Sequence, residues 1–261
     1  RRRHTRFKCD WSSDVCSSDL PIGVLAGMIG KTIFAISSEE SRFTLNGALL
    51  ILRKGEVVMV ATDGHRLSMV ESSGELPGVG AAYRALLPRK AMLELQKLAA
   101  DADPESLVQF SGDEDHLFFK IGERLLLSRK LTGNFPDFER VLPKEQPHSV
   151  TLQCEEFRAA IERVAQFSDE RSRAIRVRVG DGEVKVHSSV SETGESEESI
   201  PAEYKGTAVE IGFNAQYLTD FLRAVHTDQV RFLFKDPHSA GELRPGGDAE
   251  HYRYVIMPMR I

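Results

Sequence analysis

Asp63 and His65 are the residues whose types and spacing come closest to a catalytic pair. Histidine titrates near neutral pH, and an aspartate can orient its ring for proton transfer. Such a pair also needs a nucleophile, a metal set or a second carboxylate at a defined spacing, and the sequence identifies none. Gly64 after Asp63 instead predicts a turn between two strands. We therefore expect a structural or binding role here, with a hydrolase using His65 and Asp63 as an alternative.

Residues 26–32 (AGMIGKT) end like a phosphate-binding loop. That loop also needs a glycine five residues before Gly30, because its backbone amides turn around the phosphates. Position 25 is Leu, no strand precedes the segment, and its apolar spacing is helical. The segment therefore predicts a helix with Lys31 as a charge that faces solvent or a polyanion.

Metal and redox chemistry have little support in the sequence. The acidic run 191–203 (SETGESEESIPAE) lacks the fixed ligand offsets of a calcium loop, so we expect a solvated loop there. Cys9, Cys16 and Cys154 form neither a disulfide framework nor a zinc ligand set. The sequence thus predicts no catalytic residue, no metal and no cofactor.

Composition points to a globular protein. The 261 residues are 41% hydrophobic and 28% charged, enough for two domain cores. No stretch approaches the roughly 20 apolar residues that span a membrane, so we expect a cytoplasmic protein without a membrane partner. The net charge of −5 argues against a basic-tail polyanion binder but leaves room for a local basic patch.

Residues 1–20 differ in character from the rest of the chain. They are rich in Ser, Asp and Arg, contain the only Trp and show no sustained period. The segment resembles translated adapter sequence more than a folding unit. We expect residues 1–20 to be a non-native or disordered leader that packs against nothing, with the fold beginning near Pro21.

From Pro21 onward the chain repeats one order of elements with a period of about 130 residues. Each copy has a helix, a hairpin around a glycine turn, a second helix and further strands. Segment 130–146 is rich in Pro, Gly and charge and reads as the connector. We predict domains at 21–143 and 144–261, each an α+β unit of two helices packed on antiparallel sheet.

Basic residues lie along the expected helices. They are, in the two copies, Arg89, Lys90, Lys97, Arg158, Arg163 and Arg223. On one shared face they would form a positive lining for nucleic acid. Nearby acidic residues could instead neutralise them in ordinary helix pairs, and these are Glu94, Glu155, Glu162 and Asp220. The sequence leaves the two interpretations open because pairing geometry decides between them.

Five ordered motifs together resemble one known family. They are residues 41–47 (SRFTLNG), 61–67 (ATDGHRL), 134–143 (NFPDFERVLP), 211–214 (IGFN) and 254–260 (YVIMPMR). Their order and spacing are similar to those of the β sliding clamp, the beta subunit of bacterial DNA polymerase III. The resemblance covers residues 21–261.

The resemblance implies tandem clamp domains that form part of a ring. The family has three similar domains per chain, and this sequence looks like the second and third, a fragment without the first. Family rings are homodimers that close with the first domain of one subunit against the third of its partner, a contact that needs both surfaces. Helices line the hole, where Lys and Arg attract phosphates without reading bases.

The resemblance also implies two sets of binding residues. The DNA-facing residues would be Arg42, Arg89, Lys90 and Lys97. The pocket for partner peptides would be lined by Leu45, Thr62, Gly64, His65, Arg66, Leu67, Pro136, Arg140, Val141, Asn214, Tyr217, Val255, Ile256, Met257, Pro258, Met259 and Arg260. Methionine and aliphatic side chains suit a lining that adapts to several peptides.

The implied function is that of a non-enzymatic processivity factor. It encircles duplex DNA and binds the DNA polymerase III alpha subunit, the clamp loader and other clamp-binding peptides. Besides the hydrolase, the alternative is a generic protein-interaction module without a DNA role, which the acidic net charge would suit.

Overall fold

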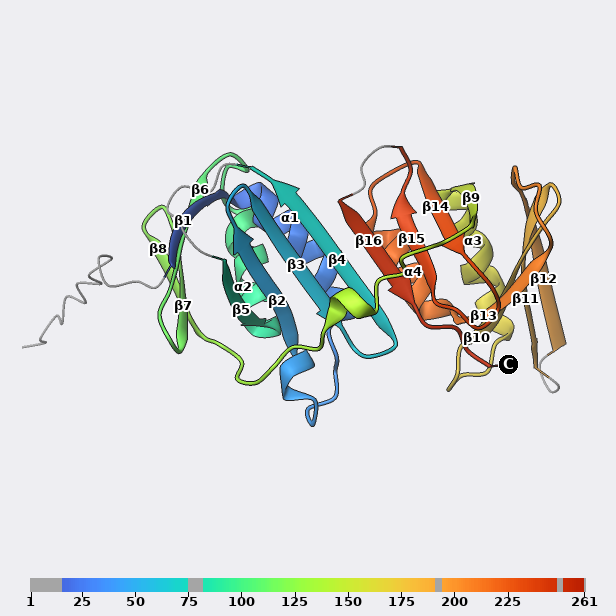
Figure 1. Ribbon diagram of the computed structural model, residues 1–261, viewed down its shortest axis with the longest axis horizontal. Helices are drawn as coiled ribbons and strands as arrows, with labels where there is room; N and C mark the ends of the chain where they lie inside the picture. The colour runs from blue at the N-terminus through green and yellow to red at the C-terminus, as the bar shows by residue number, and fades with distance from the viewer. Residues whose placement is uncertain (1–15, 75–81, 191–193, 248–250, 261) are drawn as a thin grey trace, which may run out of the picture.

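The computed structural model describes residues 16–74, 82–190, 194–247 and 251–260. These residues form two halves that lie side by side along the long axis of the molecule (Figure 1). The helices and strands of the first half are β1 (Cys16–Pro21), α1 (Ile22–Thr32), β2 (Gly47–Arg53), β3 (Glu56–Thr62), β4 (Arg66–Ser73), β5 (Tyr83–Pro88), α2 (Arg89–Ala100), β6 (Leu107–Gly112), β7 (His116–Ile121) and β8 (Arg124–Arg129).

The second half repeats this order of elements. They are β9 (His148–Gln153), α3 (Cys154–Val164), β10 (Ala174–Gly180), β11 (Glu183–Val190), β12 (Gly194–Pro201), β13 (Val209–Asn214), α4 (Ala215–Ala224), β14 (Gln229–Phe234), β15 (Gly241–Pro245) and β16 (Tyr252–Ile256). Short 3-10 turns occur at η2 (Ile33–Ala35), η3 (Phe43–Leu45), η4 (Phe138–Arg140) and η5 (Ala165–Phe167).

The two halves share one strand topology. In the first half the strand orders are β5-β2-β3-β4 and β1-β6-β7-β8, and in the second they are β13-β10-β11-β12 and β9-β14-β15-β16. In each half the helix pair lies between its two sheets (Figure 1). The predicted duplication and the α+β arrangement of two helices on antiparallel sheet are therefore confirmed.

Amphipathic helices explain how each half forms its core. In α3, Phe157, Ile161 and Val164 follow helical spacing and are all buried. In α1, Leu25 and Ile29 do the same. Since each helix presents this stripe to the sheets, burial against strands stabilises helices that are short on their own.

The halves join through β4 and β16, which pair antiparallel in the middle of the molecule (Figure 1). The register runs from Val70 opposite Tyr252 to Arg66 opposite Ile256. The pairing merges one sheet of each half into a sheet of eight strands. The junction is therefore a hydrogen-bonded ladder as well as a side-chain contact.

The connector covers the outer face of this sheet. Beneath it lies a second apolar cluster in which Leu49, Val58 and Leu67 are buried together with Phe138. Strands β2 and β3 are therefore buried on both faces, which explains their near-continuous apolar sequences. Between residues 130 and 146 the only regular element is η4, as predicted for a connector.

The prediction that residues 1–20 form a leader outside the fold is wrong for residues 16–20. Strand β1 pairs with β6, with Leu20 opposite Val108, and Leu20 belongs to the core. The physical reason is that the backbone N–H and C=O groups on this edge of β6 need hydrogen-bond partners. In the second half, β9 supplies such partners to the equivalent strand β14. Residues 1–15 lie outside the described residues.

Two further expectations are corrected by backbone pairing. The acidic segment expected to be a loop contains β12, whose eight residues pair with β11 from Glu183 to Val190. Its ladder hydrogen bonds and the cross-strand ion pair of Lys185 with Glu197, 3.1 Å, hold it as an edge strand. The first hairpin strand, which the side-chain pattern predicts over residues 41–52, begins only at Gly47 as β2, and residues 43–45 form η3.

Candidate partner-binding site

The turn between β3 and β4 organises one side of the site. The Asp63 carboxylate accepts backbone hydrogen bonds from His65, 2.9 Å, and from Arg66, 3.1 Å. The Thr62 hydroxyl donates to the Arg66 carbonyl and accepts from the Gly64 amide. Gly64 has a φ of 92°, a conformation that L side chains rarely adopt. Asp63 thus builds the turn, and its described contacts are not with the His65 ring.

Arg66 anchors this turn to both halves. Its guanidinium donates to Asp63, 3.0 Å, and to Asp220 on α4, 2.6 Å. It also donates to the Phe34 carbonyl, 2.6 Å, and lies 4.3 Å from the ring centroid of Tyr217. The side chain is only 9% exposed. Such a buried cation is stable because each of its three nitrogens donates to a partner.

The charge of Arg66 is held by these surroundings. Burial alone lowers the pKa of a guanidinium, but the Tyr254 hydroxyl and the carboxylates of Asp220 and Asp63 together raise the pKa of Arg66. We conclude that Arg66 carries a constant positive charge and that its contacts link β4 to α4 and to β16.

A small apolar cavity opens beside the turn, with a volume of about 110 Å³. Its lining comes from η3, the β3–β4 turn, the connector and β16. The residues are Leu45, Thr62, Gly64, Arg66, Leu67, Pro136, Phe138, Val141, Val255 and Met257. A cavity of this size and polarity fits one apolar side chain of a partner.

A second, more open cavity of about 440 Å³ lies on the other side of Met257. Its residues are Arg176, Glu210, Gly212, Pro237, His238, Met257, Pro258, Met259 and Arg260. The Met257 amide donates to the His65 carbonyl, 2.9 Å, and the Met259 amide donates to the Gly212 carbonyl, 2.8 Å. The segment after β16 is therefore tied on both sides, and Met257 is the wall that the two cavities share.

Three predicted pocket residues lie around these cavities without lining them. His65 is exposed, and its ring centroid lies 6.5 Å from that of Tyr217. Tyr217 packs under Arg66. Arg140 is 86% exposed and pairs with Asp137 at 2.8 Å. His65 and Arg140 are thus placed for contacts at the surface of the site, and Tyr217 supports Arg66.

Two other predicted residues have structural positions. The Asn214 side chain caps α4 by accepting hydrogen bonds from the amides of Gln216 and Tyr217. Ile256 is 1% exposed and belongs to the main core, whereas its neighbour Val255 belongs to the outer cluster. Successive strand residues face opposite sides of a sheet, so Ile256 points away from both cavities.

Several lining residues were not predicted. Phe138 lies inside a recognised motif and is buried in the outer cluster, so its apolar character was an available signal. Arg176 on β10 and Glu210 on β13 form a diagonal ion pair at 3.3 Å, and the residue directly opposite Arg176 is Gly212. His238 follows β14 in a loop, and no pattern in the sequence singles it out.

The four predicted DNA-facing residues differ in their positions and in their ion-pair and hydrogen-bond partners. Arg89 and Lys90 begin α2 and are exposed. Lys97, further along α2, pairs with Glu94 at 2.8 Å. Arg42 instead donates to the Asp63 carbonyl, 2.8 Å, at the turn beside the apolar cavity. Arg89 and Lys90 are therefore the most available basic pair of the four.

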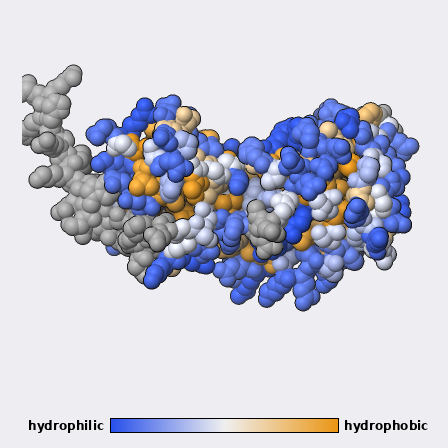
Figure 2. Space-filling model, turned by 90° about the horizontal axis from the view of Figure 1, so that it is seen from above, coloured by the Kyte–Doolittle hydropathy of each residue, from blue (hydrophilic) through white to orange (hydrophobic). Residues whose placement is uncertain are grey.

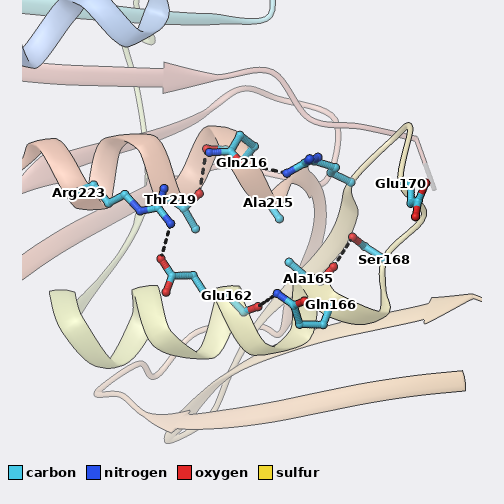
Figure 3. Close-up of a pocket in the computed structure, with 10 residues that line it drawn as sticks. Glu162, Ala165, Gln166, Ser168, Glu170, Ala215, Gln216, Thr219 and Arg223 are labelled. Atoms are coloured by element: carbon cyan, nitrogen blue, oxygen red, sulfur yellow. Dashed lines mark hydrogen bonds and ion pairs between the residues drawn. The ribbon is translucent and has the colours of Figure 1, made fainter. Parts of the chain in front are cut away.

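In the second half the helix arginines are paired with acids. Arg223 on α4 reaches Glu162 on α3 at 2.9 Å across a polar cavity between these helices (Figure 3). Arg158 also pairs with Glu162, and Arg163 pairs with Glu198 on β12. These contacts favour neutralised helix pairs over a bare positive lining there. Seen from above, at 90° to the view of Figure 1, the surface of the protein is largely hydrophilic, with smaller hydrophobic areas (Figure 2).

Groups of three or more His, Cys, Asp or Glu side chains placed to hold a metal ion do not occur among the described residues. In the same part of the chain, each helix is too short or too polar to cross a membrane.

Comparison with known proteins decides the family. The central-domain model of the DNA polymerase III beta subunit matches residues 19–137, and its C-terminal-domain model matches residues 139–260. The beta sliding clamp of Caulobacter vibrioides is 35% identical over 260 residues, covering 96% of this chain and 68% of that protein. The chain belongs to the beta sliding clamp family.

Other clamps agree in sequence and in shape. The beta sliding clamp of Pseudomonas putida is 36% identical over 237 residues, 91% of this chain. The chain spans 64% of the length of that relative. The crystal structure of the sliding clamp from Pseudomonas aeruginosa superposes with a TM-score of 0.90 at 34% identity, covering 95% of this chain and 68% of that clamp.

Proposed function

We propose that this chain is the partner-binding part of a DNA polymerase processivity factor. In this function the complete homodimeric ring encircles duplex DNA without sequence specificity, and this chain supplies two of the domains of each subunit. It tethers the DNA polymerase III alpha subunit, the clamp loader and other clamp-binding peptides. The chain does this in the cytoplasm and by binding alone, as a clamp and not as an enzyme.

The double cavity around Met257 is the observation that carries the proposal. The apolar cavity fits one aliphatic or aromatic anchor of a peptide, and the wider one continues the surface past Met259. Both are built on backbone that hydrogen bonds hold in place, so little ordering accompanies binding. Methionine walls adapt to different side chains, which suits a site with several partners.

Exposed Arg89 and Lys90 support weak binding to the phosphate backbone. They open α2, whose N-terminal amides also favour anions. Contacts of this kind exchange along a duplex without reading bases, which is what sliding requires.

We expect the Arg89→Glu, Lys90→Glu double variant to weaken DNA binding several-fold at low salt and to reduce its salt dependence, because fewer counterions are released. Fluorescence anisotropy with duplex DNA measures this. Arg140→Glu, at a side chain beside the peptide site, is the matched control and should leave DNA binding close to that of the parent chain. An unchanged salt slope in the double variant would place the DNA surface elsewhere.

We also expect residues 1–261 alone not to stay topologically linked to circular DNA, because they match the central and C-terminal domains of the family and the family ring closes through the first domain. The measurement is gel-filtration retention on nicked circular DNA at high salt, compared with linearised DNA. Retention that linearisation abolishes would contradict the expectation and show a closed ring.

The alternatives differ in what they require. A hydrolase would need the Asp63 carboxylate to orient the His65 ring, but that carboxylate binds the turn amides and Arg66. Hydrolysis lost specifically in His65→Ala would favour it. A generic interaction module would bind peptides and show no salt-dependent DNA affinity.

A further inference from the structure

The connector crosses the outer face of β16 and β15 on its way to β9, and two side-chain hydrogen bonds tie it there (Figure 1). The Arg253 guanidinium on β16 donates to the Pro143 carbonyl, 3.1 Å. The Gln146 side-chain amide donates to the Ala240 carbonyl, 2.9 Å. Pro143 follows two residues after Val141, which lines the apolar cavity. The connector is therefore fastened close to the part of it that forms a cavity wall.

Arg253 is itself held by a carboxylate that is fully buried. Glu242 on β15 is 0% exposed, and it accepts hydrogen bonds from Arg253 at 2.6 Å and 3.2 Å. It also accepts one from the Nε of Arg244 at 2.9 Å. The side chains of Arg253 and Arg244 are 22% and 19% exposed, so little water can replace these bonds. The Glu242 carboxylate therefore fixes the direction of the Arg253 guanidinium.

Glu242 lies next to the lining of the apolar cavity. It stands opposite Val255 in the ladder of β15 and β16, and paired residues of a ladder face the same side of the sheet. Val255 supplies the sheet side of the cavity lining, and Phe138 and Val141 supply the connector side. The ion pair of Glu242 with Arg253 thus links the strands on one side of the cavity to the connector on the other.

Apolar residues occupy the same two positions in the first half. Strands β1 and β9 end directly before α1 and α3, so these two strands are equivalent in the repeat. Carried across the ladders of each sheet, this equivalence makes Phe118 on β7 the counterpart of Glu242. By the same register Leu125 on β8 is the counterpart of Arg253. The same strand order therefore forms without charges at either position.

A buried ion pair of this kind is weak evidence for a stabilising role. Removing a carboxylate and a guanidinium from water costs free energy that their attraction often only offsets, and well-packed apolar side chains of similar volume are often as stable. An apolar pair cannot, however, supply a directed donor for the Pro143 carbonyl. The position of the connector is therefore what the pair of Glu242 and Arg253 adds.

We propose that Glu242 and Arg253 are positioning residues for the partner peptide. They hold the connector against the sheet at Pro143, and this fixes the width of the apolar cavity between Val141 and Val255. A cavity of fixed width discriminates between peptide anchors, because a side chain that is too small leaves part of the lining without contacts. Both residues lie outside the cavity lining. The proposal rests on the proposed function, and it names the residues that set the specificity of that site.

The first test measures anchor selectivity. The probes are a peptide with Gln and Leu-Phe anchors and two copies of it, with Ala in place of the Leu or of the Phe. Competition fluorescence anisotropy gives the ratio of dissociation constants, and the parent chain should prefer the larger anchor at the cavity by about tenfold or more. In the double variant Glu242→Leu, Arg253→Leu this ratio should fall several-fold. Its melting temperature should stay close to that of the parent chain, since an apolar pair replaces the ion pair.

Two further variants separate positioning from the loss of an ion pair. Arg253→Lys keeps a cation beside Glu242, but one ammonium does not reproduce the fork of donors of a guanidinium, so the ratio should again fall. Arg163→Gln removes the ion pair with Glu198, 2.6 Å, outside the peptide site and should keep the ratio of the parent chain. A merely structural role of Arg253 would weaken all three peptides alike and leave the ratio unchanged.

Amide hydrogen exchange of the free protein tests the positioning without any peptide. The amides of Val141 and Leu142 donate to the Phe138 carbonyl, and these two bonds should open more often when the connector is released. We expect several-fold faster exchange of both amides in the double variant and in Arg253→Lys. Unchanged exchange, or an unchanged selectivity ratio in a folded variant, would overturn the proposal. If the parent chain binds none of the peptides, the proposed function fails, and the exchange rates still decide whether Glu242 and Arg253 position the connector.

Discussion

Replacing Arg66 by alanine is expected to lower the free energy of unfolding by about 3 kcal/mol or more. The guanidinium is 9% exposed and joins Asp63 on the turn to Asp220 on α4. Its removal leaves both carboxylates partly buried without their cation, and the Phe34 carbonyl without its donor. The two halves lose the ion pair that crosses their junction.

Urea unfolding followed by circular dichroism measures the effect of Arg66→Ala. Arg140→Ala is the matched control, because the ion pair of Arg140 with Asp137 is exposed and should contribute less than about 1 kcal/mol. Arg66→Lys should recover only part of the loss, since one ammonium cannot reach all the partners of a planar guanidinium. Equal stability of Arg66→Ala and Arg140→Ala would contradict the role assigned to Arg66.

The second large effect is expected on peptide affinity. Met257→Ala should weaken binding of a clamp-binding peptide with Gln and Leu-Phe anchors by well over tenfold. A central anchor contact typically contributes about 2 kcal/mol, and Met257 borders both cavities. Met259→Ala should also exceed tenfold, because Met259 lines the wider cavity. Deleting residues 257–261 removes both side chains and should abolish most of the binding.

Calorimetric titration of each variant measures these affinities, with melting curves to show intact folding. His65→Ala is the control at the surface of the site and should cost less, because its loss leaves the apolar lining in place. If both methionine variants bind as tightly as the parent chain, the peptide site lies elsewhere.

Much of the fold could be predicted because the same spacing of apolar side chains and turns occurs in both halves of the sequence. Phe157, Ile161 and Val164 define one helix, and the glycine turn between β10 and β11 defines a hairpin. The missed strands lack such spacing. Strand β1 is polar and β12 is acidic. Each forms a strand because its backbone pairs with that of a neighbouring strand, β6 and β11 respectively. The repeat itself held the missing signal for β1, since a strand-like run precedes α3.

The site could be predicted only through the resemblance. Leu45, Leu67 and Val141 look like ordinary core positions, and it is the connector folding over β4 that turns them into a cavity wall. Strand alternation separates Val255 from Ile256, a distinction that the motif alone does not make. The pairing of arginines with Glu162 depended on distances between α3 and α4 that no sequence pattern specifies.

The connector also determines how the protein can be divided into soluble pieces. It supplies Phe138 and flanking apolar residues to the cover of β2 and β3, whose sequences are apolar on both faces. A fragment ending at Lys130 would leave that face bare, and a broad apolar sheet surface in water promotes aggregation. Phe138 falls between the two matched segments, 19–137 and 139–260. A first half produced alone should therefore remain soluble only when it extends through Leu142.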